Sequence, residues 1–156
     1  MKKIIYFLLF IVVIISLDQY TKIKILQYML QHSEELNLLP FLNLTLVFNS
    51  GVAFGIFKSF GQLVPHVFSF IGVTFGLGLI IWAFLNKKHY FAMSLISAGA
   101  LGNAIDRIRL GVVIDFIDVY WQNIHWPAFN IADISICLGA CIFLYTEVFK
   151  NKKRKV

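Results

Sequence analysis

Two aspartates in apolar surroundings are the residues of this sequence best suited to do chemistry. Asp115 lies between Val112-Val-Ile and Phe116-Ile, and Asp133 follows Phe129-Asn-Ile-Ala at the start of an apolar run. Two carboxyl groups held close together at low dielectric constant do not both ionise, so one keeps a proton while the other is charged. Such a pair can act as acid and base on one water molecule. The residue types therefore predict a water-activating pair, if the fold brings Asp115 and Asp133 together.

Further polar side chains interrupt the apolar segments that precede these aspartates. A charge at a helix centre in a membrane costs about 2.5–3.5 kcal/mol on insertion scales, and its compensation usually accompanies function. Spacings of three and four residues place polar side chains on one face of a helix. Two such groups occur: Asp18 with Lys22, and Asn103 with Asp106 and Arg107.

Each of these polar groups also has a purely structural explanation. Asn130 fits the N-cap of a helix, with Asp133 in the first turn, where the helix dipole favours a carboxylate by about 0.3–1 kcal/mol. The others fit structural ion pairs or a solvated surface charge: Asp18 with Lys22, Asp106 with Arg107, and Asp118 beside interfacial aromatic residues. Taken singly these explanations stay open, but the grouping of all the clusters on one side of a membrane favours a site.

The composition is that of a membrane protein. Of the 156 residues, 59% are hydrophobic and only 14% are charged, against about 25% charged in soluble domains. The length predicts one compact domain over residues 1–156. The basic residues cluster at the chain ends and in one short loop, so nucleic acid is not an expected partner. Cys137 and Cys141 are expected to be small buried apolar residues.

The apolar segments predict a membrane all-α fold with a small β element. About 20 residues span a bilayer as a helix, and four transmembrane helices are predicted: Ile4 to about Ile25, Leu63–Leu85, Tyr90 to about Ile105, and Ile131–Phe149. Partial alternation of apolar residues predicts a strand from Leu42 to Phe48, ended by a turn at Asn49-Ser50-Gly51. This strand is expected in a small surface sheet, and 110–129 is expected to be interfacial, with Tyr120, Trp121 and Trp126 in the aromatic belt.

The basic residues predict the orientation in the membrane. Nine Lys and Arg residues fall on the side of the two termini and five on the other side, which places both termini in the cytoplasm. The candidate site then lies near the outer face. Gly99 and Gly102 make the third helix thin, which permits close helix packing and could admit a further apolar helix from a substrate.

Five motifs in this sequence resemble those of the lipoprotein signal peptidases, the aspartic membrane proteases of bacteria. They occur in the family's order over nearly the whole chain: Asp18-Gln-Tyr-Thr-Lys22, Asn49-Ser-Gly-Val-Ala-Phe-Gly55, Gly99-Ala-Leu-Gly-Asn103-Ala-Ile-Asp106-Arg107, Val112-Val-Ile-Asp115-Phe116, and Phe129-Asn130-Ile-Ala-Asp133. Ser50 and Ile114 are mild departures from the family pattern.

The resemblance implies an endopeptidase of the bacterial inner membrane with four transmembrane helices and a surface β-cradle. The implied substrate is a prolipoprotein whose cysteine carries diacylglycerol, cut just before that cysteine. Asp115 and Asp133 would activate the water, without metal or cofactor, in a monomer that contacts membrane lipid. Residues implied to bind substrate or support the site are Asp18, Lys22, Asn49, Gly51, Asn103, Asp106, Arg107 and Asn130.

Two other classes of function fit some of the same residues. A transporter or proton-coupled channel also uses acidic residues inside the membrane, but it would spread them through the membrane depth, whereas Glu147 is the one acid expected near the inner face. A metal-dependent phosphatidyl-group transferase could use Asp115 and Asp118 with a divalent ion. For the peptidase, a shared proton predicts activity with an acid limb and a basic limb.

Overall fold

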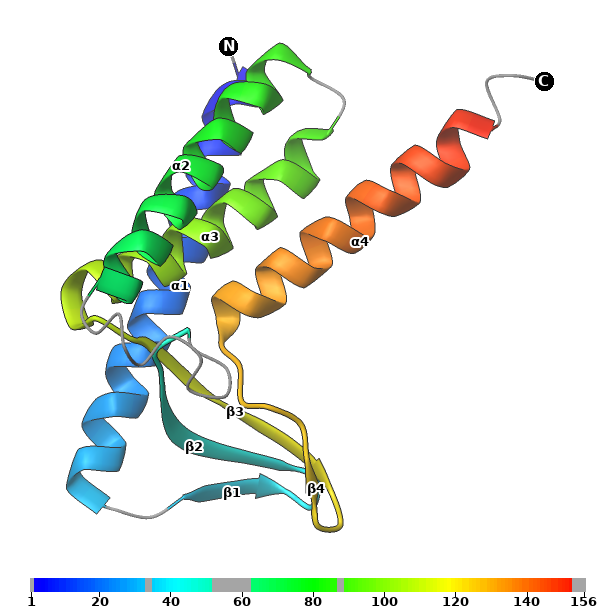
Figure 1. Ribbon diagram of the computed structural model, residues 1–156. Helices are drawn as coiled ribbons and strands as arrows, with labels where there is room; N and C mark the ends of the chain where they lie inside the picture. The colour runs from blue at the N-terminus through cyan, green and yellow to red at the C-terminus, as the bar shows by residue number, and fades with distance from the viewer. Residues whose placement is uncertain (1, 33–34, 52–62, 87–88, 153–156) are drawn as a thin grey trace.

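The computed structural model describes residues 2–32, 35–51, 63–86 and 89–152. Four helices and four short strands follow one another along the chain (Figure 1). Their bounds are α1 (Lys2–His32), β1 (Leu36–Leu39), β2 (Leu42–Asn49), α2 (Leu63–Leu85), α3 (Tyr90–Leu110), β3 (Val113–Trp121), β4 (Ile124–His125) and α4 (Ile131–Lys152). The sheet lies at one end of the helices, and the start of α1 and the end of α4 lie at the other end.

Within the described residues, three helices are long and apolar enough to cross a membrane. They contain the stretches Ile4–His32, Leu63–Leu85 and Ile131–Val148. The fourth, α3, carries several polar and charged side chains and packs against α1, α2 and α4. Because other helices cover most of α3, it does not need the uniformly apolar surface that lipid contact requires. Of the four helices expected to span the membrane, three therefore have the length and apolar composition that this requires.

Small residues bring the backbones of α3 and α4 into direct contact. A Cβ atom added to Gly99 would lie 2.3 Å from the carbonyl oxygen of Ala132, and one added to Gly139 would lie 2.8 Å from that of Ala92. The predicted close packing at Gly99 is thus present. The further expectation that this face admits a substrate helix is wrong, because α4 already occupies it.

The sheet is antiparallel throughout, in the order β1-β2-β3-β4. β2 confirms the predicted strand. β3 was expected only as an interfacial segment, because its first four residues are all buried and so show no alternation of apolar and polar positions. In the β2–β3 register, Asn49 lies opposite Val113 and Val47 opposite Asp115. Residues 52–55 of the predicted second motif lie outside the described residues.

Three helices continue beyond their predicted ends, among them α4, which reaches Lys152 instead of Phe149. The helix α2 has the bounds predicted for it. α1 reaches His32 instead of about Ile25, and α3 reaches Leu110 instead of about Ile105. Gly111 ends α3 in the left-handed conformation with φ of 74°, which glycine adopts without steric cost. The expectation that Cys137 and Cys141 are buried is wrong, because both are exposed on α4.

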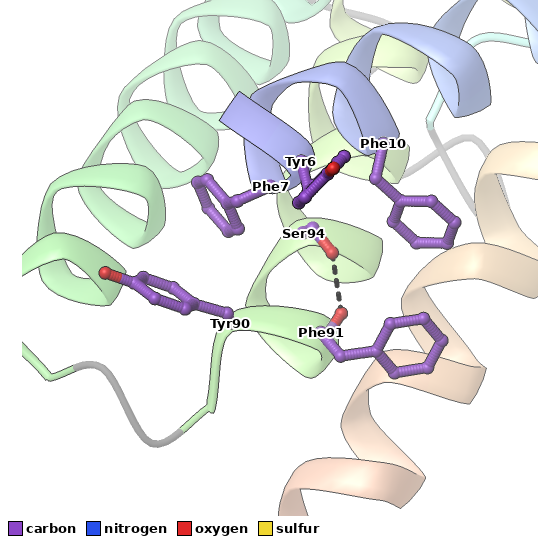
Figure 2. A pocket seen from close by; sticks show the side chains of 6 residues that line it. All are labelled: Tyr6, Phe7, Phe10, Tyr90, Phe91 and Ser94. Atoms are coloured by element: carbon purple, nitrogen blue, oxygen red, sulfur yellow. Dashed lines mark hydrogen bonds between the residues drawn. The ribbon is translucent and has the colours of Figure 1, made fainter. Parts of the chain in front are cut away.

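The end of the helices away from the sheet is apolar and aromatic. Buried side chains of α1, α2 and α3 form the core there, among them Phe7, Ile11, Ala83 and Met93. A cavity of about 340 Å³ opens between α1 and α3 beside this core, lined mainly by aromatic rings (Figure 2). The polar groups described next lie at the opposite, sheet end of the helices.

Candidate active site

Two asparagine side chains connect Asp115 of β3 to Asp133 of α4. Asn130 Nδ2 donates to Asp115 Oδ1 at 2.6 Å and to Asn103 Oδ1 at 3.1 Å. Asn103 Nδ2 in turn donates to Asp133 Oδ1 at 2.8 Å. A continuous chain of hydrogen bonds therefore runs from one carboxyl group to the other, and the two aspartates singled out in the sequence belong to one cluster.

Asn130 and Asp133 also cap the N-terminus of α4. Asn130 Oδ1 accepts a hydrogen bond from the backbone N–H of Asp133 at 2.9 Å, and Asp133 Oδ2 accepts one from the N–H of Asn130 at 3.2 Å. This reciprocal arrangement is a capping box. The structural explanation of these residues is therefore correct, and it is compatible with the site, because the same two side chains use their remaining atoms to reach Asp115 and Asn103.

Asn49 holds the other oxygen of Asp115 from the neighbouring strand. Its Nδ2 donates to Asp115 Oδ2 at 2.8 Å, and its Oδ1 accepts from the N–H of Gly51 at 2.8 Å. Gly51 has φ of 78°, a conformation that favours glycine. A Cβ atom there would lie 3.3 Å from the Phe68 ring and 3.7 Å from Arg107 Nη2. Gly51 thus lets the chain turn beside Arg107 at the end of β2.

A buried lysine joins α1 to α3 beneath this cluster. Lys22 Nζ lies 2.8 Å from Asp18 Oδ2 and 2.8 Å from Asp106 Oδ2, and it donates to Asn103 Oδ1 at 2.9 Å. The three ammonium protons are thereby used. The predicted Asp18–Lys22 pair is confirmed, but the structural pair expected between Asp106 and Arg107 is replaced by the one between Asp106 and Lys22.

The two carboxylates that flank Lys22 hold the backbone immediately before each candidate catalytic aspartate. Asp106 Oδ2 accepts a hydrogen bond from the N–H of Ile114 at 3.3 Å, and Asp18 Oδ1 accepts one from the N–H of Ala132 at 2.9 Å. Ile114 precedes Asp115, and Ala132 precedes Asp133. The positions of β3 and α4 at the site therefore depend on one buried ionic cluster.

Arg107 brings a positive charge to the same end of α3. Its guanidinium lies over the Phe68 ring, 5.6 Å from the ring centre, and Nη1 donates to the carbonyl oxygen of Asn103 at 3.5 Å. The guanidinium attracts the carboxylates of Asp133, Asp115 and Asp106. Within the described part of the chain, its buried Nε has no hydrogen-bond partner.

The surroundings of Asp115 favour its neutral form. Burial raises the pKa of the Asp115 carboxyl, and the nearby charge of Asp133 raises this pKa further. Hydrogen bonds from Asn49 and Asn130 act in the opposite direction, but the pKa remains above its ordinary value. An apolar environment and a second carboxylate are the conditions under which one member of a pair holds its proton to higher pH than an isolated aspartate.

Asp118 differs from the expectation of a solvated surface charge. It is buried, and its two oxygens lie 3.0 and 2.8 Å from His125 Nδ1. Asn43 Nδ2 also contacts it at 3.5 Å. The ring of His125 stacks on Tyr120 across the β3–β4 pair. Asp118 therefore belongs to the sheet, apart from the chain that links Asp115 to Asp133.

Comparison with known proteins establishes the family. The family model described as signal peptidase (SPase) II matches residues 10–149. The chain belongs to the signal peptidase II family. It is 43% identical over 140 residues to a lipoprotein signal peptidase of Thermodesulfovibrio yellowstonii, covering 90% of this chain and 92% of the relative. The corresponding protein of Janthinobacterium sp. is 42% identical over 142 residues, covering 87% and 84%.

Solved structures agree with this membership of the signal peptidase II family. Two structures of a bacterial membrane enzyme, determined by the in meso method at 2.3 and 1.9 Å resolution, are 32% identical to this chain. The match to the first structure spans 97% of this chain and 92% of the chain in that structure, with a TM-score of 0.73. The second covers 92% and 93%, with a TM-score of 0.75. Family and spanning helices together make this a bacterial membrane protein of a protease family.

Proposed function

We propose that this signal peptidase II is an aspartic endopeptidase that removes the signal peptide from diacylglyceryl-modified prolipoproteins, cutting just before the lipidated cysteine. The observation that carries the proposal is the hydrogen-bond chain that joins Asp115 to Asp133 through Asn130 and Asn103. The names of the relatives support the substrate class. No metal or cofactor enters the proposed reaction.

In the proposed reaction Asp115 carries the shared proton and Asp133 is charged. Asp133 takes a proton from a water molecule while the water oxygen bonds to the carbonyl carbon of the scissile peptide. The carboxyl of Asp115 gives its proton to the carbonyl oxygen, which forms a tetrahedral intermediate. When the carbon–nitrogen bond breaks, the leaving nitrogen takes the proton that Asp133 removed from water. The carbonyl of the released peptide re-forms as its hydroxyl proton returns to Asp115.

The supporting residues have distinct proposed roles. Asn103 and Asn130 position the two carboxyls, while Asp18, Lys22, Asn49, Gly51 and Asp106 hold the backbone and side chains around them. Arg107 offers unused guanidinium hydrogen-bonding capacity to a peptide carbonyl of the substrate. This assignment is supported by its buried Nε, which lacks a partner within the described residues.

The proposed setting is the bacterial inner membrane, with both termini in the cytoplasm. The start of α1 and the end of α4 both lie at the end of the helices opposite the sheet, which agrees with the excess of basic residues near the termini. We place α3 as a fourth membrane-crossing helix, enclosed by the other three. The active site is then near the outer face, where the lipid of the modified cysteine anchors the scissile bond. We expect a monomer whose outer surfaces contact lipid.

A cleavage assay tests the proposal. A purified diacylglyceryl-modified prolipoprotein is incubated in detergent with wild-type enzyme, Asp115→Asn or Asp133→Asn, with a chelator throughout, and the released mature protein is followed by its mobility. Glu147→Gln, at the far end of α4, is the control acid. We expect cleavage by wild type and the control and none by the two site variants.

Other outcomes of this assay identify the rival functions. Full activity of either folded site variant would remove that aspartate from the pair. Activity that requires a divalent ion would favour the phosphatidyl-group transferase. A folded wild-type protein that does not cleave the substrate would favour a transporter or proton-coupled channel.

A further inference from the structure

Gln19 contacts both of the carboxylates that hold the site backbone. Its Nε2 donates to Asp106 Oδ1 at 2.8 Å and lies 3.2 Å from Asp18 Oδ2 and 3.2 Å from the carbonyl oxygen of Gly102. Its Oε1 accepts from Arg109 Nη1 at 3.3 Å. The sequence signals no role for Gln19 beyond its place within the first motif, because Asp106 and Arg109 are more than 80 residues away along the chain.

The charges around Gln19 explain why a neutral donor is needed at this place. Asp18 and Asp106 are both buried, and both contact the ammonium group of Lys22. Lys22 reaches only Oδ2 of Asp106, and among the described residues the hydrogen-bond donor to Oδ1 is Gln19. An ionised carboxylate buried without donors on both oxygens is costly. The amide of Gln19 therefore supplies the donor that a second cation would otherwise supply.

Arg109 fixes which way the amide of Gln19 points. A guanidinium can only donate hydrogen bonds, so it requires the amide oxygen to face it. The amide nitrogen is then directed toward Asp18 and Asp106. Gln19 and Lys22 thus bridge the same two carboxylates, and those carboxylates hold the N–H groups of Ile114 and Ala132.

We propose that Gln19 is a positioning residue of the reaction, whose amide keeps Asp18 and Asp106 together and thereby sets how Asp115 and Asp133 face each other. This inference rests on the proposed aspartic mechanism. Gln19 acts through other residues, so its loss changes the rate of the chemical step and leaves substrate binding unchanged. Small displacements of catalytic groups are sufficient for large effects, since about 1 Å of misplacement can cost on the order of 100-fold in rate.

The variant Gln19→Glu tests the proposal with almost no change in shape. It replaces the amide donor by a carboxylate beside two others, which repel it. We expect kcat to fall by about 10- to 100-fold with KM within about twofold of wild type. Gln27→Glu makes the same chemical change at an exposed position of the same helix and is expected to behave as wild type.

The pH dependence separates positioning from a general loss of structure. The titratable and charged groups that face Gln19 are Asp18 and Lys22 of α1 and Asp106 and Arg109 of α3. When the introduced carboxyl is protonated at acidic pH, it can again donate to Asp106. The wild-type to variant ratio of kcat is therefore expected to shrink as the pH falls. A ratio that is constant with pH, or a kcat equal to that of wild type, would overturn the proposal.

A second variant decides the matter if Gln19→Glu does not fold, as judged by its thermal unfolding in detergent. Arg109→Leu, at an exposed position, leaves Gln19 in place but removes the group that orients its amide. We expect a severalfold lower kcat and an unchanged KM, and no change in kcat would contradict the proposal. Wild-type cleavage in the same assay tests the proposed function itself, so that failure of either idea is recognised separately.

Discussion

Asp115 and Asp118 lie three residues apart on β3, and both are buried, yet they have different partners. The carboxyl of Asp115 accepts hydrogen bonds from the amides of Asn49 and Asn130 and lies near a second carboxylate, Asp133. Asp118 instead faces the imidazole of His125, with its ring half-exposed. An odd spacing on a strand directs two side chains to opposite faces of the sheet, so the two carboxyls meet different partners.

This comparison shows that burial alone does not make a carboxylate a candidate for catalysis. Among the described residues, the direct hydrogen-bond partners of the Asp115 carboxyl are amides and not a paired cation, which leaves its proton available for exchange. Asp118 next to histidine forms a local contact between β3 and β4. Equivalent substitutions can be made at the two aspartates and at their neighbours. Comparing their effects tests whether the different surroundings give the two aspartates different functions.

The largest contrast is expected between Asp115→Asn and Asp118→Asn. Loss of a group that transfers protons costs about 10²–10⁴-fold in rate, so Asp115→Asn is expected to reduce kcat for prolipoprotein cleavage by at least this amount. Asp118→Asn is expected to keep most of the wild-type rate. Equal losses in the two folded variants, measured in the same cleavage assay, would show that the comparison has no functional meaning.

A smaller contrast is expected between Asn130→Ala and Asn43→Ala. Asn130→Ala removes both the helix cap, worth about 1 kcal/mol, and the link between the aspartates. We expect its melting temperature to fall by roughly 2–4 °C and its kcat to fall by about tenfold or more. Asn43→Ala removes a 3.5 Å contact with Asp118, so we expect its melting temperature and its kcat to be close to those of wild type.

A dependence of stability on pH is expected for Asp115. Folding raises the pKa of Asp115 above its ordinary value of 3.8. The contribution of its carboxyl to stability is therefore complete below that value and is lost as the pH rises through the folded-state pKa. The melting temperature of wild type minus that of Asp115→Asn should decrease from about pH 4 to about pH 8. An increase over this range would contradict the raised pKa.

The smallest effect is expected for His125→Phe. The substitution keeps an aromatic ring to stack on Tyr120 but removes the donor to Asp118. Because the histidine side chain is half-exposed, water can replace part of the lost contact, so we expect a slight decrease in melting temperature and an unchanged cleavage rate. A large loss of activity in this variant would draw Asp118 into the reaction.

Local patterns in the sequence predicted the elements that such patterns can encode. The continuous apolar run of Leu63–Leu85 predicted α2 with its observed bounds, and alternation predicted β2. The fourfold spacing of Asp18 and Lys22 predicted their ion pair. β3 was not predicted as a strand because both of its faces are covered at its start, which removes the alternation that would reveal it.

Contacts between distant segments could not be predicted in the same way. Arg107 follows Asp106 directly in the sequence, but the ionic partner of Asp106 is Lys22 from another helix. The assignment of Asp118 to the surface failed because the hairpin that brings His125 back to it has no strong turn signal. Asp115 and Asp133 were found because aspartates in apolar runs are unusual, but the asparagine amides that join them depend on the packing of α3, α4 and the sheet.

The pairing of Asp18 with Lys22 within α1 has a consequence for the synthesis of this protein. α1 precedes α3 and α4 along the chain, so it is synthesised before Asp106 and before Ala132, whose N–H bonds to Asp18. Asp18 and Lys22 are four residues apart on one helix, so their charges can neutralise each other. α1 can therefore be inserted into the membrane without a partner helix. When α3 and α4 pack against α1, Lys22 gains Asp106 as a second partner and Asp18 binds the N–H of Ala132. The pair then lies at the centre of the candidate site. The proposed mechanism needs Asp133 of α4, so it predicts that unfinished copies of the chain are inactive.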